Sequence, residues 1–328
     1  MQIYYHISLL ILTLLLINFR ISISKRLGIV DKPDNFRKLH ENPTPSIGGL
    51  LILINFIISI IFLSTDGDLR FKILLIWCFL TIFFCSLGFL DDRVQLKPLV
   101  KTFLILSMLL ITLPLDESLK FNNLIFTDIK YIIVLKQSAL FFTIFAIFLL
   151  FNAINFSDGL NGVLPCQTIF WLIVLIDIDG QNFFLISLLI CLIIIFLFNI
   201  NGKLFLGNSG SSIISIILSL YFIKIYNENL IKFDEIVLIF FLVIIDTIRI
   251  IIERVINNQS PFSGDNNHFH HLLAKVFKKQ LVFIPYLFLT ITPYITFMIF
   301  KIETYYILFL NIAVYFLLLL FLKKIQND

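Results

Sequence analysis

Two adjacent carboxylates, Asp91 and Asp92, are the most informative feature of this sequence. They end a nearly continuous apolar run, residues 71–90, and Arg93 follows them directly. Neighbouring carboxylates at the mouth of a membrane span are costly to desolvate and repel each other. The C-terminal end of a helix is also unfavourable for negative charge. A cation such as Mg²⁺, which prefers hard oxygen ligands, or a proton to be moved would explain the pair.

A second group of oxygen-bearing side chains lies at residues 152–162. Asn155 and Asp158 are three positions apart, so they share a face if the segment is helical, although the nearby glycines indicate that a helix ends there. Their amide and carboxylate oxygens suit a hard metal ion. Asn161 has the groups to contact a base or a sugar, with a helix cap as its alternative role.

Three further clusters offer partners for phosphate. Lys38 and His40 lie in a proline-containing loop, where they would hold an anion or serve simply as positive anchors. The run 207–212 opens an apolar segment, and free amide N–H groups at a helix start suit a phosphate; an ordinary N-cap is the alternative.

The third of these clusters is His268, His270 and His271. A transition-metal site is one interpretation, but no cysteine lies nearby to complete a typical zinc site. Imidazoles that donate hydrogen bonds to phosphate oxygens are the other interpretation. Hard-metal ligands combined with phosphate partners are the requirements of phosphoryl transfer, in which positioning and charge neutralisation dominate. One substrate would be a soluble nucleotide derivative and the other a lipid phosphate.

The composition indicates what must hold these clusters in place. The chain has 328 residues, 59% of them hydrophobic and 14% charged, with a mean hydropathy of +1.00. A soluble domain of this size has no way to bury that much apolar surface, so the sequence predicts an all-α polytopic integral membrane protein. The net charge of +4 gives no reason to expect a nucleic-acid partner. The four cysteines lie in or beside apolar runs and do not have metal-site spacing.

We expect about eleven transmembrane helices, with ten as the alternative count. The loop at 115–137 is expected to be a short extracytoplasmic hairpin or a plain connector. The N-terminal residues lack a basic leader and a cleavage site, so we expect the first span to be retained. The predicted spans lie near 3–22, 48–64, 71–90, 99–114, 138–156, 163–178, 183–200, 207–226, 235–252, 281–300 and 303–322.

The distribution of basic residues sets the orientation. Of the 25 Lys and Arg residues, fifteen lie in the loops after odd-numbered spans or in the C-terminal tail, against eight on the opposite side. The positive-inside rule therefore predicts an external N-terminus and a cytoplasmic C-terminus. All five polar clusters fall at cytoplasmic ends. We expect a single transferase domain, 1–328, with active-site loops near 23–47, 91–98, 157–162, 201–210 and 253–280.

Together, in this order from Asp31 to His271, the clusters resemble the polyprenyl-phosphate N-acetylhexosamine-1-phosphate transferases of glycosyltransferase family 4. The resemblance implies transfer of a sugar 1-phosphate from a UDP-sugar, such as UDP-GlcNAc, to undecaprenyl or another polyprenyl phosphate, with release of UMP. It implies Mg²⁺ as cofactor, with Mn²⁺ as a substitute, and a multi-pass protein of the inner (cytoplasmic) membrane with its active site facing the cytoplasm. The reaction would begin the synthesis of a cell-envelope glycan such as O-antigen of lipopolysaccharide, teichoic acid or capsule. The chain would act alone or as a homodimer.

The resemblance also implies roles for individual residues. Asp91 and Asp92 would be the catalytic pair that activates the lipid phosphate, together with Asp158 and His268. Asn155 and Asn208 would lie at the metal. The substrate-binding residues would be Lys38, His40, Asn161, Arg254, His270 and His271.

Two departures from the family pattern concern charge. Asn208 stands where the family usually has an aspartate that binds Mg²⁺, so metal affinity should fall unless other carboxylates compensate. Asn266 replaces a basic residue and Gly264 a proline, so the grip on phosphate there would rest on Arg254 or the histidines.

Three other functions stay open from the sequence. The run from Pro261 to His271 resembles the N-acetylglucosamine branch more than the muramyl-pentapeptide branch of peptidoglycan synthesis. An ion-coupled transporter would need ionisable residues near the membrane midplane, whereas the charges here gather at one face. A non-catalytic relative would bind the UDP-sugar without releasing UMP.

Overall fold

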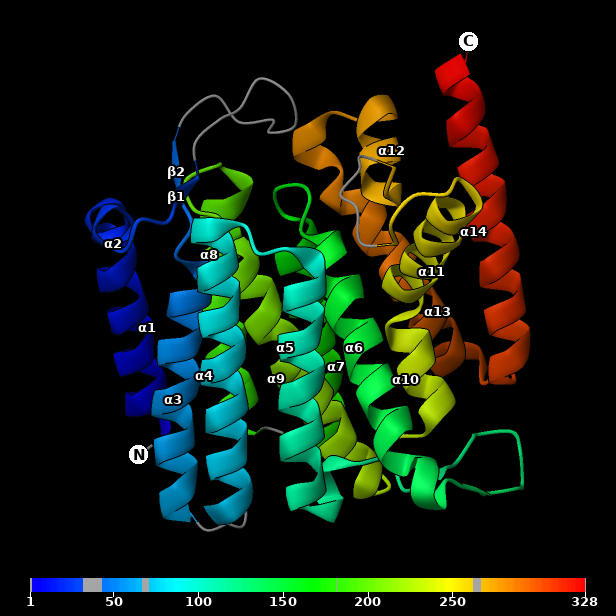
Figure 1. Ribbon diagram of the computed structural model, residues 1–328, viewed down its shortest axis with the longest axis horizontal. Helices are drawn as coiled ribbons and strands as arrows, with labels where there is room; N and C mark the ends of the chain where they lie inside the picture. The colour runs from blue at the N-terminus through cyan, green and yellow to red at the C-terminus, as the bar shows by residue number, and fades with distance from the viewer. Residues whose placement is uncertain (1, 32–42, 67–70, 181, 262–266, 328) are drawn as a thin grey trace. The chain divides into compact units, whose positions relative to one another are not determined.

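A computed structural model describes residues 2–31, 43–66, 71–180, 182–261 and 267–327 (Figure 1). These residues form fourteen α-helices, four short 3₁₀ turns and two small two-stranded sheets, so the all-α prediction is confirmed. The chain divides into two compact units, and each is built from two separate stretches of sequence. Unit 1 comprises residues 1–108 and 164–218, and unit 2 comprises residues 109–163 and 219–328.

Unit 1 is a helical bundle with one short β-ladder. In the ladder, Val30 pairs with Pro45 in antiparallel register. Helix α3 is its centre, since it packs against α1, α4 and α8. The elements of this unit are α1 (Gln2–Asn18), α2 (Arg20–Leu27), β1 (Val30–Asp31), β2 (Thr44–Pro45), α3 (Gly48–Asp66), α4 (Phe71–Val94), most of α5 (Pro98–Thr112), α7 (Val163–Asp179) from its second residue, α8 (Phe183–Ile200) and the first half of α9 (Gly207–Asn227).

Unit 2 contains the rest of the helices and a β-hairpin. The hairpin pairs Asn123 with Val134, which confirms the hairpin interpretation of the 115–137 loop. Its elements are η1 (Leu113–Leu115), η2 (Glu117–Leu119), β3 (Asn123–Leu124), β4 (Ile133–Val134), η3 (Lys136–Ser138), α6 (Ala139–Ser157), the end of α9, α10 (Phe233–Ile239), α11 (Phe241–Ile256), α12 (Phe269–Val276), η4 (Lys279–Leu281), α13 (Phe283–Phe300) and α14 (Thr304–Asn327).

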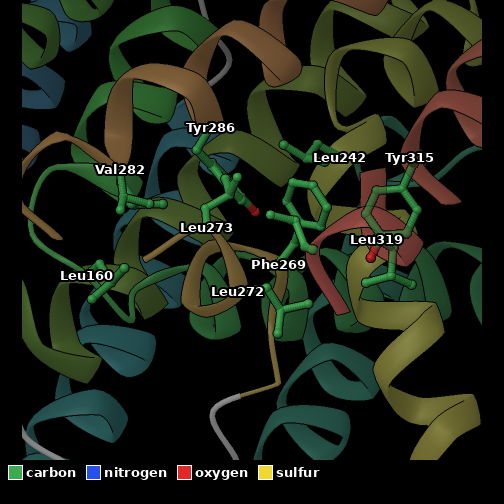
Figure 2. Close-up of a cluster of buried hydrophobic side chains, with 11 residues drawn as sticks. Leu160, Leu242, Phe269, Leu272, Leu273, Val282, Tyr286, Tyr315 and Leu319 are labelled. Carbon is green, nitrogen blue, oxygen red and sulfur yellow. The ribbon is translucent and has the colours of Figure 1, made fainter. Parts of the chain in front are cut away.

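A buried apolar cluster in unit 2 holds the short helix α12 in place (Figure 2). Phe269, Leu272 and Leu273 of α12 pack against Leu242 of α11 and against aromatic and aliphatic side chains of α13 and α14. Burying Phe269 completely contributes about 1.5–3 kcal/mol to folding. An eight-residue helix is too short to be stable alone, so this packing fixes the histidines that it carries.

Seven described helices are long and apolar enough to cross a bilayer, and the bent pair α1–α2 would make eight. Every one of the eleven predicted segments is helical, but two are not single straight helices. The segment 3–22 is interrupted at Phe19, where α1 and α2 meet at a bend of 67°. The segment 235–252 is divided at Phe240 into α10 and α11. The seven helices are α4, α5 with η1, η3 with α6, α8, α9, η4 with α13, and α14.

Candidate functional site

The carboxylate cluster of unit 1 forms where the end of α4 meets the start of α9. Asp92 Oδ1 accepts a hydrogen bond from the backbone N–H of Asn208 at 2.9 Å, and Oδ2 accepts from that of Ser209 at 3.3 Å. Asp92 lies at the C-terminal end of α4, where negative charge is unfavourable. The positive N-terminal end of the α9 dipole compensates this charge. Asp92 serves as the N-cap of a helix that lies more than a hundred residues away in the sequence.

This contact corrects one expectation from the sequence. The first amides of the 207–212 run were expected to be free for a phosphate group. Those of Asn208 and Ser209 are occupied by the Asp92 carboxylate instead. The anion at the start of α9 is thus a side chain of the protein itself.

Asp91 has different partners from Asp92. Its Oδ2 is 2.8 Å from Nζ of Lys101 on α5, and its Oδ1 accepts from the backbone N–H of Leu96 at 2.9 Å. The Asp91 and Lys101 side chains are only 13% and 16% exposed, so solvent screens this ion pair weakly. Lys101 is thus the cation paired with Asp91.

Gly88 allows the two helices to approach closely enough for these bonds. A Cβ atom at Gly88 would collide with the backbone of Asn208 and Ser209. Close backbone approach through small residues is typical of membrane helix pairs. Asn208 itself is half-buried and joins this cluster through its backbone N–H, and its role as a metal ligand stays a prediction.

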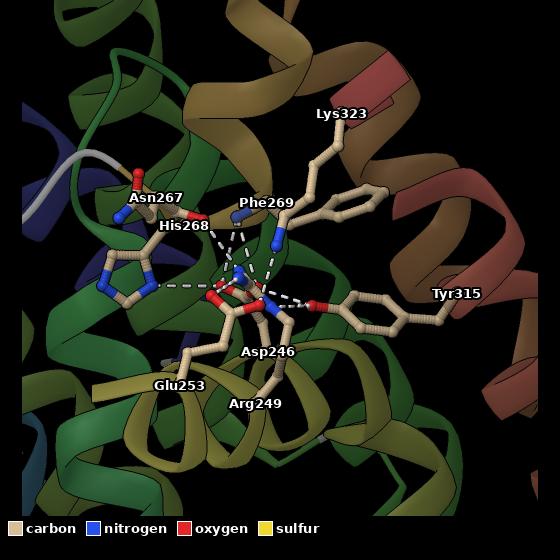
Figure 3. A network of polar contacts seen from close by, with 8 residues as sticks. All are labelled: Asp246, Arg249, Glu253, Asn267, His268, Phe269, Tyr315 and Lys323. Atoms are coloured by element: carbon tan, nitrogen blue, oxygen red, sulfur yellow. Dashed lines mark hydrogen bonds and ion pairs between the residues drawn. The ribbon is translucent and has the colours of Figure 1, made fainter. Parts of the chain in front are cut away.

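The histidine cluster of unit 2 is anchored by a buried polar network around Asp246 of α11 (Figure 3). Asp246 Oδ1 accepts from Arg249 Nη2 at 2.6 Å and from the Tyr315 hydroxyl at 2.7 Å. Its Oδ2 lies 3.1 Å from His268 Nδ1. Because a carboxylate only accepts, Nδ1 of His268 carries a proton in this contact.

Further bonds extend this network. Asp246 also accepts from the backbone N–H of Phe269, the first residue of α12, so it caps that helix. Arg249 donates to the Asn267 carbonyl at 2.8 Å and to Glu253 at 2.9 Å. Three helices, α11, α12 and α14, are thereby joined around His268. A buried charge is tolerated when it is paired and hydrogen-bonded in this way.

His270 lies between the other two histidines and the loop after α6. Its ring is parallel to that of His268 at 5.7 Å and is tilted against that of His271 at 4.2 Å. A Cβ atom at Gly159 would collide with Nε2 of His270, so only glycine fits there. The loop containing Asp158 and the histidine cluster are therefore neighbours.

Burial lowers the pKa of His270 well below its ordinary value, and electrostatic interaction with the neighbouring His271 and His268 lowers it further. Neither ring nitrogen of His270 has a hydrogen-bond partner among the described residues. His270 is therefore a neutral imidazole at physiological pH, whereas its predicted role was to bind phosphate.

Arg254, predicted to grip phosphate, is 2% exposed. Its Nη1 donates to the Pro261 carbonyl at 2.7 Å, and its guanidinium lies 5.4 Å from the centre of the Phe156 ring. Arg254 thus anchors the segment that leads to the histidines, and any contact with substrate remains a prediction.

The predicted residues at the end of α6 are close together in unit 2. The helix ends at Ser157, and Asp158 follows as its C-cap, with its N–H donating to the Asn155 carbonyl at 3.3 Å. This confirms that the helix ends before the glycines. Asn155, Asp158 and Asn161 are each partly exposed. Lys38, His40, Gly264 and Asn266 lie outside the described residues.

The sequence interpretation missed three residues of these clusters: Lys101, Asp246 and Tyr315. Asp246, with Arg249 and Glu253, has helical i, i+3 and i+7 spacing within an apolar run, a pattern that could have revealed it. Tyr315 carried no such signal, because its role depends on α14 packing beside α11 and α12.

The carboxylate cluster has the chemistry that Mg²⁺ prefers. Asp91, Asp92 and Asn208 offer hard oxygen donors, and Mg²⁺ is typically held by one or two carboxylates together with substrate phosphates and water. Within the described part of the chain, no three His, Cys, Asp or Glu side chains are arranged as a complete metal site. The residues therefore fit a metal that arrives with a phosphate-bearing substrate better than one in a closed protein cage.

Comparison with known proteins shows which sequences this chain is similar to. Residues 74–226 match the sequence model of glycosyl transferase family 4. Over these residues the chain is similar to members of this family. The matched region includes Asp91, Asp92, Asp158 and Asn208, while the histidine cluster lies beyond it.

Individual relatives extend the similarity beyond that region. The chain is 27% identical over 288 residues to the undecaprenyl-phosphate alpha-N-acetylglucosaminyl 1-phosphate transferase of Escherichia coli O157:H7, covering 82% of this chain and 75% of the relative. It is 28% identical over 260 residues to a probable undecaprenyl-phosphate N-acetylglucosaminyl 1-phosphate transferase of Bacillus subtilis (strain 168), covering 76% and 71%. These family relatives are glycosyl-1-phosphate transferases, which supports transferase activity here.

Proposed function

We propose that this protein transfers N-acetylhexosamine 1-phosphate from a UDP-sugar to undecaprenyl phosphate or another polyprenyl phosphate. A phosphate oxygen of the lipid would attack the β-phosphorus of the UDP-sugar. The bond from that phosphorus to the bridging oxygen would break, and UMP would leave with that oxygen. The products are polyprenyl-diphosphate-sugar and UMP.

The observation that carries this proposal is the coincidence of the carboxylate cluster with the family match. The relatives are named for transfer to undecaprenyl phosphate, and the matched region contains the Asp91–Asp92 pair. Phosphoryl transfer depends chiefly on positioning and charge neutralisation, and Asp91 with Lys101 provides a fixed negative and a fixed positive group.

Each cluster would have a distinct part. Lys101 would neutralise phosphate charge while Asp91 orients or activates the attacking lipid phosphate. Asp92 would hold Asn208 in place through the start of α9. In unit 2, the imidazole of His268 would donate a hydrogen bond to a phosphate group, and Asn161 would contact the nucleotide.

Mg²⁺, with Mn²⁺ as a substitute, would be held in unit 1 by Asp91, Asp92 and Asn208. When bound, it would neutralise charge on the phosphates. Asn208 supplies a carbonyl oxygen where the family pattern has a charged one, so we expect Mg²⁺ to bind more weakly than in a variant with Asn208→Asp.

The protein would lie in the cytoplasmic membrane with these clusters facing the cytoplasm, where UDP-sugars are found. The excess of Lys and Arg in the loops after odd-numbered spans supports this orientation. The glycan that the product initiates would belong to the cell envelope.

The direct test is UMP release by purified protein with Mg²⁺, undecaprenyl phosphate and a panel of UDP-N-acetylhexosamines. Asp91→Asn should reduce turnover about ten- to a hundredfold, since charge-assisted contacts of this kind contribute about 1.5–3 kcal/mol each. Mass spectrometry of the lipid would identify the sugar. Folded protein that turns over none of these donors would contradict the proposal.

One observation favours a second candidate, a non-catalytic relative that binds UDP-sugar. Asn208 lacks the charge that the family pattern provides for Mg²⁺. The same experiment separates the candidates: calorimetric binding of UDP-sugar without UMP release, even at high Mg²⁺, would favour the second.

A further inference from the structure

The β3–β4 hairpin of unit 2 exposes an apolar tip. Tyr131 is 82% exposed, and its neighbours Ile129, Ile132, Ile133 and Val134 are each at least 50% exposed. A contiguous apolar run of this kind in a loop marks an interaction surface rather than an ordinary connector.

Hydrogen bonds place this tip at the end of a membrane span. Asp128 Oδ2 accepts from the backbone N–H of Thr304 at 2.6 Å and from its hydroxyl at 2.9 Å. Thr304 begins α14, which is long and apolar enough to cross a bilayer and is mostly exposed on its sides. Asp128, where the tip begins, therefore lies beside the first residue of α14, at the end of that candidate membrane span.

The hairpin lies at the opposite end of unit 2 from the histidine cluster. Strand β4 leads through η3 into α6, and the other end of α6 leads to Asp158 beside the histidines. Since η3 with α6 has the length and composition of a membrane span, the two ends lie at opposite membrane faces.

A cavity of about 230 Å³ lies beneath the hairpin. It is formed by the hairpin, the start of α10 and the start of α14. Its apolar lining consists of Phe126, Ile129, Phe233, Val237, Tyr305 and Leu308. The polar atoms at its edge already have partners, because the Thr304 hydroxyl is 2.6 Å from Asp234 as well as 2.9 Å from Asp128. The space left over therefore suits a hydrocarbon chain rather than a polar ligand.

The surroundings match a membrane–water interface. Tyr131, Tyr305 and Tyr306 are at least half exposed, and Lys130 and Lys301 are exposed beside them. Tyrosine rings favour the headgroup level, and lysines there complement lipid phosphates. These are independent indications of lipid as the occupant.

We propose that the hairpin, residues 124–134, and the cavity beneath it form a lipid-binding surface in the leaflet opposite the histidine cluster. The tip lies in the headgroup and upper acyl region, and one acyl chain of a bilayer phospholipid fills the cavity. This surface is separate from the proposed transfer chemistry and can be tested without turnover.

Tryptophan fluorescence tests the position of the tip. The chain has two tryptophans, Trp77 and Trp171, and both are buried, so Tyr131→Trp adds a distinguishable signal. The protein is placed in vesicles of phosphatidylcholine and phosphatidylglycerol. We expect the emission of the added tryptophan to be shifted to the blue relative to tryptophan in water. Lipids brominated near the headgroup should quench it at least twofold. Ser118→Trp, at an exposed polar position on the same side, is the control and should stay unquenched.

Red-shifted, unquenched emission from Tyr131→Trp would overturn the proposal. So would emission that shifts with protein concentration but not with brominated lipid, because it would show that a second copy covers the tip.

The cavity is tested separately with Phe126→Trp, which replaces one of its aromatic lining residues with a fluorescent aromatic residue. Brominated acyl chains should quench this reporter, and adding Val237→Phe to fill the cavity should reduce the quenching at least twofold. Native mass spectrometry of the protein without the reporter should show a retained phospholipid that Val237→Phe loses. Equal quenching and equal lipid retention with the cavity filled would refute the acyl-chain site.

Discussion

At the scale of single residues, the two carboxylates of the Asp91–Asp92 pair are not equivalent. Asp91 forms an ion pair with Lys101, whereas Asp92 binds two backbone amides of α9. The repulsion expected between neighbours is offset by different positive partners, a side chain for one and a helix dipole for the other. Asp91 is therefore the better candidate for direct contact with substrate, and Asp92 for holding the site together.

Lys101 allows a matched test of this assignment. Lys101→Gln should reduce turnover about ten- to a hundredfold, because a hydrogen bond between charged groups contributes about 1.5–3 kcal/mol. Lys97→Gln, at an exposed position just before α5, is the control and should retain turnover close to wild type. Steady-state UMP release would measure both. Equal effects of the two substitutions would show that only general positive charge matters.

His270 gives a prediction for pH. Its pKa is lowered in the folded protein, first by burial and then by the neighbouring histidines, so folding favours the neutral ring. That contribution to stability is fully present above the unfolded pKa of about 6.5 and is lost as the pH falls towards the folded value. The Tm of the wild type should therefore drop more between pH 7.5 and 5.5 than that of His270→Gln. Parallel Tm profiles would contradict the assignment.

At the scale of secondary structure elements, both clusters use the same device. A carboxylate from one helix caps the N-terminus of another: Asp92 of α4 caps α9, and Asp246 of α11 caps α12. The first N–H groups of a helix have no partner within the helix. An aspartate beside them accepts their hydrogen bonds, and these bonds fix the position of its carboxylate. The caps place Asn208 and the histidines at defined positions.

The contact between α4 and α9 predicts the effect of a single methyl group. In Gly88→Ala, the added Cβ would collide with the backbone of Asn208 and Ser209. Backbone atoms cannot relieve this collision by changing a side-chain rotamer. We expect a loss of stability of about 1–3 kcal/mol and a comparable loss of turnover, because the Asp92 bonds depend on the same approach. Ser86→Ala, at an exposed position on α4, should change neither the Tm in detergent nor UMP release. An unaltered Tm for Gly88→Ala would argue against the close packing.

At the scale of the whole molecule, each compact unit combines two stretches that are far apart in sequence. The carboxylate cluster joins residues 91–101 to residues 208–209 within unit 1, and the histidine cluster joins the end of α6 to α11, α12 and α14 within unit 2. Neither cluster would survive truncation to a contiguous half of the chain.

Orientation in the membrane gives the prediction at this scale. In intact cells, a membrane-impermeant maleimide should label Ser118→Cys, near the hairpin, but should label Lys275→Cys, on α12, only after permeabilisation. Both positions are exposed, so the comparison depends on membrane side rather than on burial. The native cysteines provide little background, since three of them are buried. The reverse labelling pattern would invert the predicted topology.

The sequence by itself determined the class of protein and the helical segments, and it singled out the polar clusters whose chemistry is proposed above. Apolar runs of about twenty residues have few alternatives to helix in a membrane, and polar clusters between them stand out against that background. The hairpin at 115–137 and the end of α6 before its glycines were predictable for the same local reasons.

Only the tertiary structure decided how the polar groups are paired. Partners such as Asp92 with the start of α9, or Asp246 with Tyr315, depend on which helices pack together, and hydropathy does not encode that choice. The breaks at Phe19 and Phe240 were also hidden, because both residues continue an apolar pattern. The pair Asp91–Asp92 was evident from the sequence. The sequence did not show that Asp91 pairs with a lysine or that Asp92 binds the start of a helix.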